Sequence, residues 1–396
     1  MDNLKEKFLK IAKIGEDENG GISRVFGSSS LKEAQSEMLS FFESCGLDAY
    51  KDSVGNVHGI LKSEKENAGE ILIGSHLDTV KQGGMFDGLL GIVAGAACAS
   101  ALKEEGYPLT KDIHVIATNG EEGNDLGGTF GSRAMMGLLP LESQEFITKA
   151  EKMGFLMDNL QNARLDVSHA TCYLELHIEQ GSTLYNHKEQ IGIVTGIVGL
   201  RRYKVTINGT SNHAGTTMME DRNDALVSAA RVILMGDELA RNMGHHFVET
   251  VGMLSVYPGS APVIPGKVEM ILEMRNEDEY RMDAFLQEYE KKAKEIAKVT
   301  IEPVVKKAPV KCDNKLISLI TDVCKEKEVS YREMPSGATH DGNAMAMGMP
   351  IGMIFVPSKN GISHAKDEWT EWEDIEKGVS VLLQTIKNLE KEEKIC

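Results

Sequence analysis

The sequence lacks the segments that mark secreted, membrane-spanning and nucleic-acid-binding proteins. Its N-terminal stretch is polar, without the apolar run and small-residue cleavage site of a signal peptide. The longest apolar stretch, Leu89–Leu102, is interrupted by Gly91 and Gly95, which fits a buried helix rather than a membrane span. With 43 basic and 60 acidic residues the net charge is -17, and no basic run would draw the chain to nucleic acid or to an anionic membrane.

Cysteine is scarce as well, and no two cysteines have the Cys-x-x-Cys spacing of a metal or redox site. Scattered cysteines of this kind are typical of reduced thiols, so we expect a cytoplasmic protein. None of them lies in a motif for nucleophilic catalysis. The six cysteines are Cys45, Cys98, Cys172, Cys312, Cys324 and Cys396.

Two domains are expected, because 396 residues are too many for one compact core. Short apolar runs separated by helical patterns predict buried strands in a largely parallel sheet, an α/β catalytic domain flanked by helices. One predicted helix, Leu31–Cys45, ends at a favourable capping residue, Gly46. The predicted strands are Ile71–Ile73, Ile113–Ala117, Cys172–Leu176 and Ile351–Val356.

Residues 201–310 have a different pattern and predict an inserted α+β domain within a catalytic domain of residues 1–200 and 311–396. The chain is expected to return to the first domain through Pro303–Val310. One larger continuous domain is the alternative. The order expected in the insertion is strand Tyr203–Ile207, helix Asn223–Leu239, strands Val251–Val256 and Val268–Met274, and helix Asp278–Ala297.

Potential metal ligands follow each predicted strand of the first domain. His76 follows the first strand, His177 the third, and His364 lies in the loop after the fourth. Glu121 and Glu122 follow the second strand. Ligands of open α/β sheets bind at the carboxyl ends of the strands, so these side chains predict one site assembled from distant sequence.

Asp87 adds a fifth ligand, in a loop whose glycines allow a sharp turn. Three imidazoles and two carboxylates suit Zn²⁺, with Mn²⁺, Co²⁺ or Ni²⁺ as alternatives. Five ligands exceed what one catalytic ion uses, so we expect two ions about 3.5–4 Å apart that share one carboxylate. Asp87 is the natural bridge, because its loop lies between two strand ends.

Because Glu121 and Glu122 are adjacent, one of them can ligate a metal while the other acts as general base to the attacking water. Asp78 is positioned to accept a hydrogen bond from the His76 imidazole and fix its tautomer. Taken singly, each residue has a structural explanation: a strand-end histidine, a turn-forming aspartate or a solvated glutamate pair. Those explanations fail together, because all five potential ligands coincide with strand ends or the loop between them.

These motifs resemble the signature of the M20 metallopeptidase family. Gly74–Val80 and Gly84–Gly88 carry that resemblance. Further motifs, in the expected order along nearly the whole chain, resemble its hydantoinase/carbamoylase branch, which includes N-carbamoyl-L-amino acid hydrolases, allantoate amidohydrolases and β-ureidopropionases. They are Leu176–Gly181, Asn212–Thr217, Pro335–Ala338, His340-Asp341 and Ser363-His364.

The resemblance implies roles for the ligands. His76 and His177 would hold one ion, and Glu122 and His364 the other. Asp87 would bridge the two ions. Glu121 would then be the catalytic acid and base.

For residues 201–310 the resemblance implies a lid that mediates homodimerisation. His213 would reach the partner's active site and stabilise the oxyanion. Arg275 would grip the substrate carboxylate, a task that suits a planar guanidinium. Gln180 would be a further substrate contact. One departure affects the substrate pocket, since Pro262 stands where the branch usually has a substrate-contacting Asn.

The expected function is hydrolysis of a linear amide or ureido C–N bond in a small carboxylate substrate, such as an N-carbamoyl-L-amino acid. Allantoate is the alternative substrate within the branch. An M20 aminoacylase or dipeptidase is a second enzymatic alternative. A non-catalytic binding protein is the alternative from another class, and the intact set of Glu121 and metal ligands argues against it.

Overall fold

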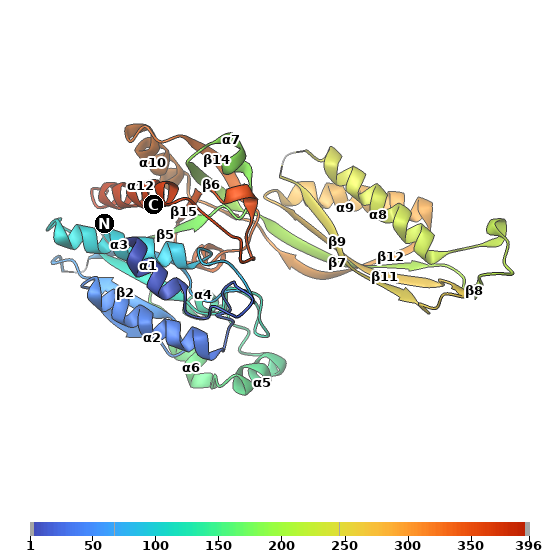
Figure 1. The fold of residues 1–396 in the computed structure, drawn as a ribbon, viewed down its shortest axis with the longest axis horizontal. Coiled ribbons are helices and arrows are strands. Elements are labelled where there is room, and N and C mark those ends of the chain that lie inside the picture. The colour runs from blue at the N-terminus through green and yellow to red at the C-terminus, as the bar shows by residue number, and fades with distance from the viewer. Residues whose placement is uncertain (1–3, 67, 245, 393–396) are drawn as a thin grey trace. The chain divides into compact units, whose positions relative to one another are not determined.

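The structure is a computed structural model that describes residues 4–66, 68–244 and 246–392. The chain divides into two compact units, Met1–Thr195 with Lys311–Cys396, and Gly196–Val310. The second unit is an insertion, because both of its ends join the first (Figure 1). The cysteines at 45, 98, 172, 312 and 324 are buried and free, and Cys396 lies outside the described residues.

The first unit contains a nine-stranded sheet in the order β1-β2-β4-β3-β5-β15-β6-β13, with β14 paired to β6. Its central strands β4, β3, β5 and β15 run parallel, while β1, β2 and β6 pair antiparallel with their neighbours. The mixed, mostly parallel sheet expected from the sequence is confirmed. Its strands are β1 (Asp48–Lys51), β2 (Val57–Leu61), β3 (Gly69–His76), β4 (Lys111–Thr118), β5 (Ala170–Ile178), β6 (Ile191–Ile197), β13 (Val310–Lys311), β14 (Tyr331–Ser336) and β15 (Ile351–Val356).

Helices flank this sheet. The helix α3 packs on β3, β4 and β5, α2 packs on β1 and β2, and α10 and α12 pack on β15. None of the described helices is long and apolar enough to cross a membrane. The helices of the unit are α1 (Leu4–Ala12), α2 (Ser29–Ser44), α3 (Leu89–Glu104), α4 (Phe130–Met135), α5 (Gln144–Lys152), α6 (Met157–Asn162), α7 (Thr183–His187), α10 (Asn314–Glu326), α11 (Gly342–Met345), η2 (Lys359–Gly361) and α12 (Trp372–Leu389).

Close packing of α3 on the sheet positions the loop that precedes it. A Cβ added to Gly91 would lie 2.3 Å from the Leu176 carbonyl oxygen, and one added to Gly95 would lie 2.9 Å from Ile73 Cγ2. Small residues therefore let the helix backbone approach β3 and β5. The start of α3, and with it Asp87, is held beside the carboxyl ends of these strands.

The second unit is a four-stranded antiparallel sheet in the order β12-β7-β11-β9, packed against α8 and α9 (Figure 1). Apolar residues alternate along β7 and β11, and those that face the helices form a separate core with Phe285 and Tyr289. The elements are β7 (Gly199–Asn208), β8 (Asn212–His213), η1 (Met219–Asp221), α8 (Ala225–Asn242), β9 (Val248–Tyr257), β10 (Val263–Ile264), β11 (Lys267–Asn276), α9 (Glu279–Ile296) and β12 (Lys298–Lys307).

One expectation for this unit is wrong. Pro303–Val310 was expected to be a connection, but Lys298–Lys307 form the edge strand β12, so the expected element order lacked one strand. The pairing of β12 with β7 shifts register between Pro303 and Val305. Proline is tolerated there because an edge strand at an irregularity does not need its amide as a donor. The short β8–β10 pair was missed as well.

The core of the second unit predicts a stability test on α9. Phe285 is fully buried between Phe247 and Tyr289, with ring centroids 4.9 and 5.7 Å away. Phe285→Ala should lower the free energy of unfolding of this unit by about 3–5 kcal/mol, because it leaves a cavity. Tyr280→Ala is the control on the same helix, since Tyr280 is 85% exposed. Denaturant unfolding followed by circular dichroism measures both, and equal effects of the two would contradict the assigned core.

Candidate metal centre

The strand ends of the first unit bring the predicted ligands to one edge of the sheet. His76 is the last residue of β3, and His177 lies one residue before the end of β5. Glu121 and Glu122 follow β4, and Asp87 precedes α3. These three strands are parallel neighbours, which explains why their carboxyl ends converge.

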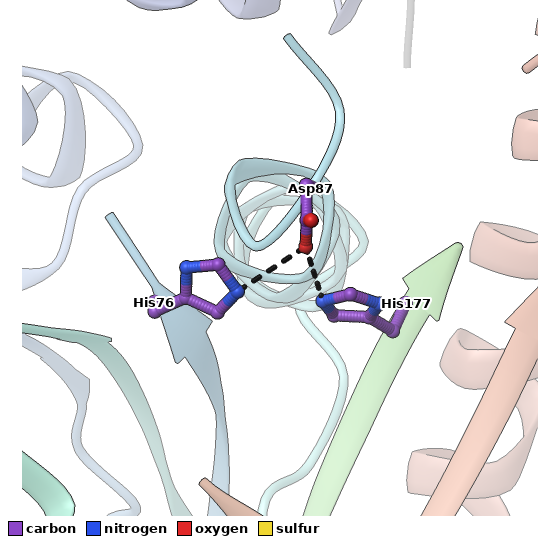
Figure 2. A group of neighbouring side chains, drawn as sticks. All are labelled: His76, Asp87 and His177. Carbon is purple, nitrogen blue, oxygen red and sulfur yellow. Dashed lines mark ion pairs between the residues drawn. The ribbon is translucent and has the colours of Figure 1, made fainter. Parts of the chain in front are cut away.

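The carboxylate of Asp87 lies between the rings of His76 and His177 (Figure 2). Its Oδ1 is 3.3 Å from Nε2 of His76 and 3.1 Å from Nε2 of His177. On the far side of each ring, Nδ1 lies 2.9 Å from a backbone oxygen, that of Asp78 for His76 and that of Ile178 for His177. A carbonyl only accepts hydrogen bonds, so each Nδ1 carries the proton and each Nε2 of a neutral ring has a lone pair. The Nε2 of His177 also accepts from the Gly88 amide at 3.2 Å.

This donor set fits a divalent cation. Two imidazole lone pairs and a carboxylate oxygen converge on one point, and Oδ1 of Asp87 accepts no hydrogen bond from the described residues. A buried carboxylate oxygen without a donor is costly, and a cation would satisfy all three atoms at once. Burial lowers the pKa of His76, but the nearby carboxylates of Asp87 and Glu121 outweigh it and raise that pKa. The same negative potential favours a metal ion.

The second oxygen of Asp87 faces another group of ligands. Its Oδ2 lies 3.2 Å from Nε2 of His364, which in turn lies 3.2 Å from Oε1 of Glu122. Gln180 donates a hydrogen bond from its side-chain nitrogen to the same Asp87 oxygen at 2.9 Å. Asp87 therefore faces both groups, one with each oxygen, which is the geometry that a bridging carboxylate requires.

Glu121 is buried close to both groups, with a carboxylate oxygen within 4.8 Å of ligand atoms of His76 and Glu122. Burial raises the pKa of Glu121 well above its usual value; His76 opposes this, while Asp341 and Glu122 add to it. A carboxyl group with a raised pKa can accept a proton and return it in a later step.

The hydrogen bond expected between the His76 ring and Asp78 is present, and its acceptor is the backbone oxygen of Asp78. The carboxylate instead accepts from the amides of Gly120 and Glu121 on Oδ1, at 2.8 and 3.0 Å, and from Glu122 on Oδ2 at 3.1 Å. Three consecutive amides after a strand need acceptors, and one buried carboxylate satisfies them. Asp78 thus shapes the turn that carries both glutamates.

Three buried carboxylates near the site were given no role from the sequence. Glu175 accepts hydrogen bonds from Ser75 and from the Gly342 amide, at 2.9 and 3.2 Å. Asp341 accepts from Ser132 and Thr118, and Glu368 from the amides of Phe86 and Asp87. An acid inside the apolar run of β5 was a usable signal for Glu175. Nothing local distinguishes Glu368 from the exposed acids near it.

His213 and Arg275 belong to the second unit. His213 is exposed on β8, and its Nδ1 accepts hydrogen bonds from the amides of Gly215 and Thr216 at 3.0 and 3.2 Å. Its Nε2 therefore carries the proton and can donate. The carbonyl of Pro262 accepts from the Ala214 amide at 2.9 Å and helps to hold this loop.

Arg275 lies on β11, where its guanidinium pairs with Glu273 at 2.9 Å. Glu273 is also paired with Arg202 of the neighbouring strand β7. Arg275 and Arg202 thus share one carboxylate, that of Glu273.

Residues 72–388 match the sequence pattern of peptidase family M20/M25/M40. The chain belongs to this family. It is 37% identical over 402 residues to an N-carbamoyl-L-amino acid amidohydrolase of Geobacillus stearothermophilus, covering 98% of each chain. It is 34% identical over 396 residues to an allantoate amidohydrolase of Escherichia coli (strain K12), covering 96% of this chain and 95% of that one.

Among solved structures, an amidase of the hydantoinase/carbamoylase family from Burkholderia multivorans matches with a TM-score of 0.89 at 27% identity, covering 99% of this chain and 98% of that one. The family resemblance, the fold class and the amidohydrolase class expected from the sequence are confirmed. Family membership also supports dependence on metal ions, for which the clustered histidines and carboxylates provide ligands.

The role of Asp78 leads to a prediction about metal binding. Asp78→Asn leaves one acceptor oxygen for three amides, so the turn with Glu121 and Glu122 should shift and weaken metal affinity about 10- to 100-fold. Titration of the metal-stripped protein against a chelating dye measures this. Asp125→Asn, in the same loop but exposed, should bind metal like the wild type. Equal affinity of all three proteins would contradict the role of Asp78.

Proposed function

We propose that this protein is a di-metal amidohydrolase that cleaves the linear ureido C–N bond of N-carbamoyl-L-amino acids. The observation that carries the proposal is Asp87, whose two oxygens face two separate sets of ligands beside the buried Glu121. Relatives named N-carbamoyl-L-amino acid amidohydrolases, at 37% and 35% identity over nearly the whole chain, support this substrate class.

Two ions would be held by five side chains. We assign His76 and His177 to one ion, Glu122 and His364 to the other, and Asp87 to both. Zn²⁺ is proposed because three of the ligands are imidazoles, with Mn²⁺, Co²⁺ or Ni²⁺ as alternatives. Such ions, when bound, polarise the scissile carbonyl and make water acidic enough to attack near neutral pH.

The chain's own residues would move the protons. Glu121 takes a proton from the attacking water and delivers it to the leaving nitrogen, a role for which its raised pKa is suited. Gln180, whose amide already contacts Asp87 at 2.9 Å, is proposed as a substrate contact. Arg275 would bind the substrate carboxylate.

Allantoate is the second candidate substrate. Relatives named allantoate amidohydrolases, at 34% and 33% identity, favour it. Pro262 bears on the choice, because a proline offers neither the side-chain amide nor the backbone donor of the Asn usual in the branch. We propose a cytoplasmic location, since the described cysteines are free thiols.

We further propose that Gly196–Val310 acts as a lid and joins two chains in a homodimer. Arg275 pairs opposite Leu200 at one end of β7, whereas His213 follows Asn208 at the other end. At about 3.3 Å per residue, these ends are roughly 27 Å apart, too far for one small substrate to touch both residues of one chain. The His213 that completes a site would therefore come from the partner.

Exposed apolar side chains on the second unit support the dimer. Val227 and Leu234 of α8 are 48% and 70% exposed, and Met253 and Leu254 of β9 are 69% and 42% exposed. The strand β9 is an edge of its sheet and packs beside α8. Large exposed apolar side chains on an edge strand and on the helix beside it are typical of a protein–protein interface.

The activity is tested with a panel of N-carbamoyl-L-amino acids, allantoate, N-acyl amino acids and dipeptides, using protein loaded with Zn²⁺ or Mn²⁺. We expect release of amino acid from the carbamoyl substrates and none after chelation. Faster ammonia release from allantoate would favour the second candidate. Turnover of only acyl amino acids or dipeptides would overturn the proposal.

The matched variant for this test is Glu121→Gln, which should retain both ions and lose about 10²- to 10⁴-fold in kcat. Metal analysis and the panel assay are run on the same sample, so loss of activity through loss of metal is recognised. Wild-type turnover by the variant would exclude Glu121 as the base.

Mixed dimers test the shared site. A His213→Ala chain keeps the metals and Glu121, while a Glu121→Gln chain can supply His213 to its partner. Each variant alone should be at least about 10²-fold less active than the wild type. Random mixing of the two should restore about a quarter of wild-type activity, since half of the dimers then hold one complete site.

The control mixture pairs the Glu121→Gln chain with a chain that carries both substitutions, and it should stay inactive. If the first mixture also gains no activity although exchange of chains is verified by mass spectrometry, His213 acts within its own chain or not at all.

A further inference from the structure

Glu368 is a buried carboxylate outside the predicted ligand set. Its side chain is 2% exposed and lies in the loop between η2 and α12. Its Oε1 accepts hydrogen bonds from the backbone amides of Phe86 and Asp87 at 3.0 and 3.1 Å. Its Oε2 accepts from the hydroxyl of Ser363 at 2.8 Å. One carboxylate thus ties together two loops that are far apart in the sequence.

These two loops carry predicted ligands of the same ion. Asp87 itself is one of them, and Ser363 immediately precedes His364, the other. The Ser363 hydroxyl also lies 3.3 Å from Oδ2 of Asp87, the oxygen that faces His364. The network of Glu368 and Ser363 therefore controls both the backbone of Asp87 and the start of the segment that presents His364.

His364 depends more on such anchoring than the other ligands do. Its side chain is 49% exposed, whereas those of His76 and His177 are 3% and 1% exposed and are held by packing. Its backbone has a φ of 55°, in the left-handed region that is unfavourable for residues other than glycine. Such a conformation persists only when surrounding contacts fix it.

The loop around Asp87 leaves space for the carboxylate of Glu368. A Cβ added to Gly84 would lie 2.0 Å from Oε1 of Glu368, so any other residue at this position would displace it. Phe86 and Trp369, the residue after Glu368, meet edge to face with ring centroids 5.4 Å apart. Packing and hydrogen bonding thus fix Glu368 in one position.

We propose that Glu368 is a positioning residue that sets the placement of Asp87 relative to His364 and thereby the affinity of the second metal ion. It acts through the Phe86 and Asp87 amides and through Ser363, and it touches neither substrate nor metal. The inference rests on the proposed metal centre. On this proposal Glu368, which is not itself a ligand, determines whether the protein binds one ion or two.

The test is a Mn²⁺ titration of the full metal-stripped chain, with free Mn²⁺ followed by electron paramagnetic resonance. Glu368→Ala removes the whole network, and we expect the weaker of the two ions to bind about 10- to 100-fold less tightly. Ser363→Ala removes the hydroxyl that contacts Glu368 and Oδ2 of Asp87 but keeps the bonds from Glu368 to the Phe86 and Asp87 amides. It should therefore weaken the same ion while leaving the melting temperature of the metal-free protein unchanged. It stays informative if Glu368→Ala fails to fold.

Two further variants make the comparison specific. Glu368→Gln can still accept from the amides through its oxygen and donate to Ser363 through its nitrogen, so it should bind both ions within about threefold of the wild type. Glu371→Gln changes an exposed acid of the same segment, paired with Lys359 at 3.0 Å, and should have no effect. The inference would be overturned if the Ser363→Ala and Glu368→Ala proteins both bound two ions as tightly as the wild type. A wild-type protein that binds no Mn²⁺ or Zn²⁺ would instead overturn the proposed metal centre.

Discussion

The candidate site depends on holding one buried carboxylate, that of Asp87, between two sets of candidate metal ligands in a region that is already acidic. Glu121 and Glu122 lie close to it, and the carboxylate of Asp78 accepts hydrogen bonds from their backbone amides. Carboxylates gathered in a buried region repel one another and are costly to desolvate. Cations offset that cost, so folding of this edge of the sheet and metal binding stabilise each other.

Rigid elements set the buried half of the site, and loops set the rest. His76 and His177 project from parallel strands whose register fixes their separation. Gly88, with a φ of 71°, allows the Asp87 loop to approach, since a Cβ there would lie 2.3 Å from the His76 carbonyl oxygen. His364 comes from a loop instead, its side chain is half exposed, and we propose that the hydrogen bonds of Ser363 and Glu368 position it.

The sequence predicted two features, the central strands of the first sheet and the edge of that sheet where the candidate site lies. Continuous apolar runs identified β3, β4, β5 and β15, and the polar residues after them identified the edge where His76, Asp87 and His177 meet. The antiparallel strands β1, β2 and β6 were missed, because short pairs depend on their neighbours rather than on local pattern. Side-chain partners were unpredictable for the same reason: Asp78 binds amides some 40 residues away, and Glu368 binds amides about 280 residues away.

The strand order also determines when during synthesis the enzyme can become complete. The strand β15 lies between β5 and β6, yet the whole of Gly196–Val310 is translated before it. During synthesis, β5 therefore lacks its neighbour β15 while the insertion, which has its own core, is already able to fold. His364 emerges later still, so a chain that stops before it has Glu121, the proposed general base, but an incomplete set of the proposed metal ligands.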